Sequence, residues 1–340
     1  MGHCVLWVEP YPTRIVRFND FFLRKNEVKF QDPTFKSVLV INPKAIPFEP
    51  FKISNFVNFA LWKAVINKIK NFEPEVIIAG KPSKLVNFFY KRYPNIRLVF
   101  DFMDNFPNFY SGISKRSMQN QLDELMRNAD LVIASSETLF RNAKLRVRSC
   151  IKIPNGYKSD DLPNQISENK KRQPNFVYIG AVSHWFCWNS LIKICHLYPL
   201  SKVHIIGPCY STIPKKLPKN VIFHGVVKRE KAVMLAASAD LGLIPFKVNS
   251  LTESIDPIKY YEYRCLALPV LSSKFGEMDL HANDDGLFIY RNLNEIDTLL
   301  LNSLNRVRDD MDIVFKFRKK CSWAMRFNSD ILSYILLGKE

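Results

Sequence analysis

Short apolar runs alternate with longer stretches of helical period along almost the whole chain, and this alternation limits the fold more than any other feature. In the first half, strands are expected at residues 4–8, 37–41, 76–79, 97–100, 131–134 and 150–153. Helices are expected between them at residues 55–70, 83–91, 117–127 and 137–144. Strands that are apolar throughout and separated by helices form parallel sheets covered on both faces. The first half is therefore predicted to be a doubly wound α/β domain.

A polar, helix-breaking segment at residues 158–173 is interpreted as an interdomain linker, and the alternation restarts after it. Strands are expected at residues 176–179, 203–206, 221–223, 241–244, 270–272 and 287–289, and helices at 189–197, 229–238, 258–266 and 295–306. The predicted organisation is an N-terminal domain (1–157), the linker, a C-terminal domain (174–309) and a basic, aromatic helix (310–340), for which a return to the first domain is considered. Two such domains in tandem place the expected ligand cleft at the carboxyl ends of their strands.

The formal net charge of +17 is the strongest anomaly of the composition. Such an excess attracts nucleic acid, an anionic membrane surface or phosphorylated substrates. The basic residues are spread over both halves, so no nucleic-acid module is outlined and no nucleic-acid partner is predicted.

No apolar run approaches the roughly 18 to 20 residues that span a bilayer, and the first ten residues lack the pattern of a signal peptide. The seven cysteines include no CxxC pair, which indicates neither a disulfide framework nor a structural zinc site. A cytoplasmic protein without a bound metal is expected.

The segment 252–273 carries the strongest functional signal. Asp256 suits the N-cap of a helix and Pro257 its first position. Lys259 and Glu262 follow three residues apart, so they project from one face near the positive end of this helix. A cation for phosphate and a carboxylate for hydroxyl groups are what a sugar nucleotide requires. The alternative is a surface ion pair.

Two further signals come earlier in the second half. The expected strand at 176–179 runs into Gly180 and Ala181, where backbone amides can approach a pyrophosphate closely, although a glycine serving only a tight turn is the simpler reading. Residues 240–246 (DLGLIPF) form a strand that stops at a proline, which ordinary βα architecture also explains. The turn 153–157 (IPNGY) stands just before the linker.

Together these segments resemble the nucleotide-binding domain of bacterial glycosyltransferases of the GT-B fold, over residues 150–273. The resemblance is closest to transferases of cell-surface polysaccharide assembly, including the xanthan glucuronosyltransferase type and family four. It implies two Rossmann-like domains facing each other across a cleft, a nucleotide-sugar donor (a UDP-sugar favoured), no cofactor and no metal. It also implies that Lys259 binds the donor diphosphate and that Glu262 accepts hydrogen bonds from the ribose hydroxyls.

The sequence departs from the pattern of that family in three places. Many retaining members have a glutamate eight positions before the one matched by Glu262, where this chain has Ser254. The arginine and lysine usual after the first glycine turn of the second domain are missing from residues 183–191 (SHWFCWNSL). Ala267 replaces a helix-ending glycine, and a left-handed alanine costs roughly 1 kcal/mol. Inversion and retention therefore both stay open.

An acidic cap at the start of the helix would compete with phosphate for the same helix end. Ser254 or Thr252 is therefore expected to face the phosphate, with Asp256 turned aside. His184 follows the Gly180 turn at a spacing that suits contact with the donor, and packing under Trp185 is the alternative.

The candidate catalytic residues lie in the first domain, directly after the strand expected to end at Phe100. An inverting transferase needs a general base for the acceptor hydroxyl, and Asp104 is the first candidate, with Asp101 second. The alternative is that one carboxylate caps a helix or pairs with an arginine. Tyr11 and Arg14 follow the first strand and are candidates for acceptor contact, or members of a rigid surface turn.

Residues 54–70 combine apolar faces with a basic one, which suits an anionic membrane surface or, alternatively, a helix covering a sheet. The expected function is glycosyl transfer from a nucleotide sugar to a hydroxyl of a glycan or lipid-linked acceptor, at the inner face of the cytoplasmic membrane. A nucleotide-sugar epimerase or hydrolase and a non-catalytic binding protein are the alternatives.

Overall fold

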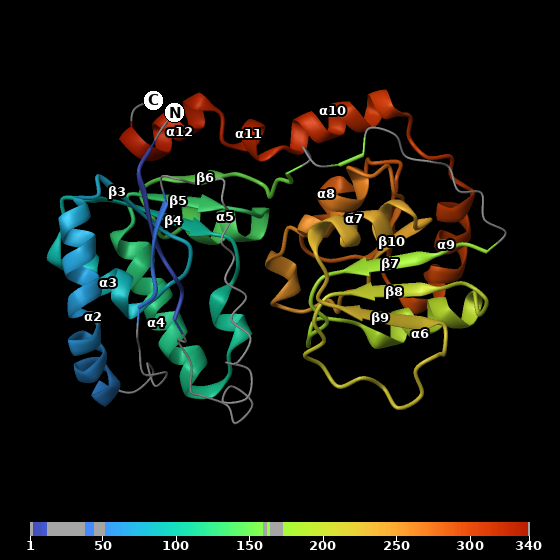
Figure 1. The fold of residues 1–340 in the computed structure, drawn as a ribbon, viewed down its shortest axis with the longest axis horizontal. Coiled ribbons are helices and arrows are strands. Elements are labelled where there is room, and N and C mark those ends of the chain that lie inside the picture. The colour runs from blue at the N-terminus through green and yellow to red at the C-terminus, as the bar shows by residue number, and fades with distance from the viewer. Residues whose placement is uncertain (1–2, 12–37, 44–51, 159–161, 164–172, 339–340) are drawn as a thin grey trace. The chain divides into compact units, whose positions relative to one another are not determined.

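Figure 1 shows the computed structural model, which describes residues 3–11, 38–43, 52–158, 162–163 and 173–338, with side chains of the first long helix described from residue 57. The chain divides into two compact units. Unit 1 comprises Met1–Ala134 and Leu139–Ile151, and unit 2 comprises Ser135–Thr138 and Lys152–Glu340.

Unit 1 is built on two parallel sheets. The smaller pairs β1 (Val5–Val8) with β2 (Val38–Ile41). The larger has the order β3 (Val76–Ala79), β4 (Arg97–Phe102), β5 (Leu131–Ala134) and β6 (Cys150–Lys152). The helices are α2 (Lys52–Phe72), α3 (Lys84–Arg92), the 3-10 helix η1 (Phe106–Phe109), α4 (Gly112–Asn128) and α5 (Glu137–Lys144). The core packs Phe100 and Phe102 of β4 against Leu125 and Met126 of α4.

Unit 2 contains a six-stranded sheet in the order β12-β11-β10-β7-β8-β9. Its strands are β7 (Phe176–Ile179), β8 (Val203–Ile206), β9 (Val221–Gly225), β10 (Leu241–Ile244), β11 (Val270–Ser273) and β12 (Leu287–Tyr290). All of its pairings are parallel. The chain adds β8 and β9 on one side of β7 and then β10, β11 and β12 on the other, so the strand order reverses between β7 and β10. Ligands of doubly wound sheets bind at this switch point.

Helices α6 to α9 lie around that sheet, and α10 to α12 follow them in the chain (Figure 1). They are α6 (Trp188–Leu197), α7 (Arg229–Ala237), α8 (Ile258–Arg264), α9 (Ile296–Asn305), α10 (Met311–Cys321), α11 (Trp323–Arg326) and α12 (Ser329–Leu337). Short 3-10 turns lie at η2 (Thr252–Ser254), η3 (Gly276–His281) and η4 (Leu293–Glu295). One continuous apolar core runs from β7 to α10.

Every expected strand and helix is present, although several bounds differ from the sequence-based expectation. Strand β4 continues to Phe102, so Asp101 lies within it. Helix α4 begins at Gly112 instead of residue 117. The expected C-terminal helix is three helices, because the side chains of Ser322 and Asn328 cap new helix starts by accepting from Met325 N (3.2 Å) and Ile331 N (3.0 Å). Helix α8 begins at Ile258 as expected, with Pro257 at its N-cap and not at its first position, and it ends at Arg264 instead of residue 266.

Helix α8 ends in a left-handed residue, as its sequence predicts. Ala267 has φ of 53° and is 1% exposed, and the amide of Leu268 donates to Tyr263 O at 3.0 Å. Within the described residues, no helix is both long and apolar enough to cross a membrane.

Candidate donor-binding site

Two glycines bring the ends of β7 and β8 into backbone contact at the switch point. Gly180 has φ of 129° and Gly207 φ of 133°, conformations that favour glycine. The amide of Gly180 donates to Ile206 O at 2.7 Å. A Cβ at Gly207 would lie 2.4 Å from the carbonyl oxygen of Gly180. The expected glycine turn is therefore also a close backbone approach.

Lys259 of α8 lies directly against this turn. A Cβ added to Gly180 would meet Lys259 Cε at 2.6 Å and Nζ at 2.7 Å. The ammonium lies over the rings of Tyr178 (5.4 Å to the centroid) and Phe246 (5.3 Å). Burial lowers the pKa of Lys259, and the Glu262 carboxylate opposes part of that change. A partly buried ammonium at a glycine turn is suited to an anionic ligand.

Glu262 lies on the same helix and is partly buried. The hydroxyl of Tyr157 donates to its Oε1 at 3.3 Å. Burial raises the pKa of Glu262, while Lys259, the Tyr157 hydrogen bond and Arg229 act in the opposite direction. In its ionised form this carboxylate is an acceptor only, which suits hydroxyl groups of a ligand.

The expected cap of α8 has a different role. Asp256 accepts hydrogen bonds from Asn155 N (2.7 Å) and from the hydroxyl of Tyr261 (3.0 Å), and Asn155 Nδ2 donates back to Asp256 O (2.6 Å). Pro257 stands at the N-cap position without a side-chain cap. Asp256 is thus turned away from the helix end, as one of the sequence expectations had it, and binds the turn before the linker.

Ser254 and Thr252 do not replace it at the helix end. The hydroxyl of Ser254, which is 1% exposed, donates to Leu251 O at 2.9 Å. The hydroxyl of Thr252, fully buried, donates to Lys247 O at 2.6 Å. Both hydroxyl protons are therefore donated to backbone carbonyls that precede η2 in the chain, and contact of Ser254 with the donor stays a prediction.

His184 and Ala181 flank the glycine turn. His184 is exposed, with Nδ1 at 3.3 Å from Ser183 Oγ and its ring edge-on to Trp185 at 5.0 Å. The ring thus meets Trp185, as the packing alternative expects, and keeps its solvent exposure. The carbonyl of Ala181 accepts from the hydroxyl of Tyr178 at 2.8 Å, which fixes the shape of the turn.

Asp101 and Asp104 belong to unit 1, at the carboxyl end of β4. Burial raises the pKa of Asp101 to about 6. Burial and the neighbouring Asp101 charge raise that of Asp104 to about 6 as well. Within the described residues, neither carboxylate has an ion pair, so the alternative of pairing with an arginine finds no partner there.

The two acceptor candidates have different outcomes. Tyr11 is 7% exposed, its hydroxyl accepts from Leu85 N at 3.1 Å, and its ring lies 5.3 Å from that of Trp62. It is a core residue and not a member of a surface turn, and its contact with the acceptor stays a prediction. Arg14 lies outside the described residues.

Tyr157 and Arg229 complete the surroundings of Glu262, and the sequence did not indicate either. The guanidinium of Arg229 lies 5.0 Å from the ring centroid of Tyr157, and its Nη2 donates to Lys158 O at 2.6 Å. The tyrosine of the IPNGY turn was visible in the sequence, but its contact spans 105 residues.

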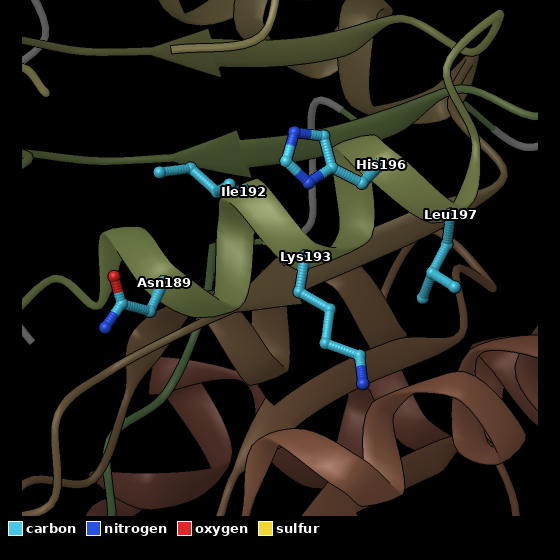
Figure 2. A pocket seen from close by; sticks show the side chains of 5 residues that line it. All are labelled: Asn189, Ile192, Lys193, His196 and Leu197. Carbon is cyan, nitrogen blue, oxygen red and sulfur yellow. The ribbon is translucent and has the colours of Figure 1, made fainter. Parts of the chain in front are cut away.

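A separate pocket of about 430 Å³ lies on α6 and is lined by Asn189, Ile192, Lys193, His196 and Leu197 (Figure 2). Lys193 forms an ion pair with Asp297 at 2.6 Å. The pocket contains none of the expected site residues.

Comparisons with known proteins identify the fold. No family model matches the chain, and no curated protein matches its sequence. The HepE protein of Anabaena, solved with UDP and glucose, has a TM-score of 0.68 at 16% identity over 97% of this chain and 98% of its own. Sucrose-phosphate synthase from Thermosynechococcus elongatus has 0.61 at 14%, over 88% and 83%. The lipopolysaccharide outer core galactosyltransferase WaaB has 0.59 at 15%, over 90% and 86%.

These likenesses show that the chain has the α/β fold of GT-B glycosyltransferases, with two Rossmann-like domains. The expected fold class is confirmed. The narrower resemblance to the xanthan type and to family four stays a prediction.

Proposed function

We propose that this protein is a glycosyltransferase that moves a sugar from a nucleotide-sugar donor to a hydroxyl of a glycan or lipid-linked acceptor. The observation that carries the proposal is the partly buried ammonium of Lys259 against the Gly180 turn, one helical turn from Glu262. HepE, which shares the fold, was solved with UDP and glucose, and this favours a UDP-sugar as donor.

Lys259 would stabilise the departing nucleotide diphosphate. Negative charge grows on the diphosphate as its bond to the anomeric carbon breaks, and a desolvated ammonium interacts with that charge more strongly than an exposed one. A bound phosphate would also stabilise the charged form of Lys259 against burial, which lowers the pKa of this side chain. In this proposal Lys259 provides the positive charge, and no metal is assigned.

Asp104 is the proposed general base, with Asp101 as the second candidate. In an inverting transfer, the acceptor oxygen bonds to the anomeric carbon, the bond from that carbon to the diphosphate breaks, and the hydroxyl proton passes to the carboxylate. With a pKa of about 6, Asp104 is mostly ionised at neutral pH and can therefore accept a proton. It is also a stronger base than an ordinary aspartate, because its pKa is closer to neutral pH.

Replacement of Lys259 by alanine tests the donor site. We expect the affinity for UDP or GDP, measured by calorimetry, to fall by about 2 kcal/mol, the size of a charge-assisted contact. Lys193→Ala makes the same change of charge on α6 and should leave affinity unchanged. Equal affinity of Lys259→Ala and the wild type would remove Lys259 from the site.

The two rival functions predict different results. An epimerase or hydrolase of this fold would form an epimer or release the nucleotide at full rate from a nucleotide sugar without acceptor, and that result would overturn the transferase proposal. A binding protein without a donor site would show no calorimetric signal with UDP or GDP.

Membrane association is the least supported part of the proposal. In α2, Trp62 is fully buried and Val65 is 6% exposed, and both pack in a cluster with Ile41 and Leu85, so the apolar face of this helix covers unit 1. The net charge of +17 still favours an anionic surface at the inner face of the membrane. Co-sedimentation with anionic but not neutral vesicles would support it, and no co-sedimentation would remove it.

A further inference from the structure

The carboxylate of Glu262 is held from outside its own helix. The hydroxyl of Tyr157 donates to Oε1 at 3.3 Å, across 105 residues of sequence. One carboxylate oxygen is thereby engaged, and Oε2 has no hydrogen bond to a described residue. A carboxylate that is fixed through one oxygen presents the other in a defined direction.

Tyr157 is itself fixed on both sides. It is 4% exposed, and its amide donates to Cys321 O at 2.9 Å. The guanidinium of Arg229 covers its ring at 5.0 Å, and Arg229 is anchored on Lys158 O at 2.6 Å. Burial raises the pKa of Tyr157, so its hydroxyl remains a hydrogen-bond donor over the whole range in which carboxylates titrate.

We propose that Tyr157, supported by Arg229, is a positioning residue that orients the Glu262 carboxylate for binding of the donor ribose diol. This inference rests on the proposed function, because it requires a nucleotide at the Lys259 site. Tyr157 acts through Glu262 and need not touch the ligand.

The charged and titratable groups around Glu262 set the direction of the effect. Lys259 and Tyr263 face it from α8, Tyr157 from the turn and Arg229 from α7. Burial raises the pKa of Glu262, and Lys259, Tyr157 and Arg229 hold it down. Loss of the Tyr157 hydroxyl or of the Arg229 charge therefore raises the pKa of Glu262. As pH falls, the Glu262 carboxylate of such a variant is protonated at a higher pH than in the wild type.

Calorimetry with UDP and 2′-deoxy-UDP, or with GDP and 2′-deoxy-GDP, from about pH 5 to about pH 8 tests the proposal. The wild type should prefer the ribonucleotide near neutral pH. Tyr157→Phe should lose about three- to tenfold of ribonucleotide affinity and little affinity for the deoxynucleotide. The pH at which the preference disappears should be higher in this variant. Arg229→Gln, at an exposed position, should also raise the pH at which the preference for the ribonucleotide disappears.

Tyr260→Phe is the matched control, since this tyrosine also donates to a carboxylate, Asp284 Oδ2, at 2.9 Å. It should lower stability and leave the preference for the ribonucleotide unchanged. The positioning role alone would be overturned if Tyr157→Phe lost equal affinity for both nucleotides. It would also be overturned if the preference of this variant for the ribonucleotide had the same pH profile as that of the wild type. A wild type that binds neither nucleotide would overturn the proposed function itself.

Discussion

Burial gives the carboxyl groups of Asp101 and Asp104 pKa values of about 6, close to that of a histidine. The unfolded chain would release these protons near the ordinary aspartate value, so the folded state binds more protons between about pH 4 and about pH 6. Their contribution to stability is therefore favourable at low pH and is lost as pH rises through this window. At neutral pH the two ionised carboxylates therefore lower the free energy of unfolding.

Replacement of Asp104 by asparagine separates this cost from its proposed use. The variant should be more stable than the wild type by up to about 3 kcal/mol at neutral pH, and the gain should vanish near pH 4. Transferase activity should fall by about 10² to 10⁴. Thermal unfolding across pH and initial rates check both. Asp285→Asn, at an exposed site, should change neither, and an unchanged rate in Asp104→Asn would exclude it as the base.

Helix α8, the element that carries Lys259 and Glu262, is anchored at its other end by buried charges. The guanidinium of Arg264, 5% exposed, contacts Asp284 at 2.7 Å and Asp309 at 2.5 Å. A Cβ at Gly286 would lie 2.2 Å from this guanidinium, so a glycine makes room for it. The ion cluster joins α8 to the segments before β12 and after α9.

Arg264→Met should destabilise the protein by about 3 to 5 kcal/mol, because the partly buried Asp284 would lose its cation and Asp309 would keep only its pair with Arg306. Urea denaturation followed by circular dichroism measures this loss. Lys91→Met breaks the exposed pair with Glu124 (2.5 Å) and should cost less than about 1 kcal/mol. Similar losses in the two variants would contradict the anchoring role.

The elements were predictable to the extent that local sequence decides them. The buried parallel strands were predicted because their residues are apolar on both faces. The predicted strand at 97–100 ended two residues before β4 does, because Asp101 interrupts the apolar run. The helical spacing of Lys259 and Glu262 predicted that they share one helix, which the structure confirms, and their binding roles stay predictions. The role of Asp256 was not, because its partner Asn155 lies 101 residues away and the sequence shows only its suitability as a cap.

At the scale of the whole molecule, the net charge of +17 acts on any anionic ligand. Affinity for UDP should decrease as salt rises from about 50 to about 500 mM, because the ions screen the summed attraction of exposed charges. Uridine, which lacks phosphate, should bind with little dependence on salt. Calorimetric titrations of both ligands at several salt concentrations check this, and parallel salt dependence would contradict it.

The left-handed alanine at the end of α8 has a consequence for how such chains are recognised. The conformation of Ala267 costs about 1 to 2 kcal/mol. Glycine would remove this strain, but it would lose a buried methyl group worth about 0.8 kcal/mol and add about 0.5 to 1 kcal/mol of chain entropy to the unfolded state. The two residues are almost equivalent here. A signature that insists on glycine at this position would pass over chains that satisfy the same backbone at nearly equal free energy.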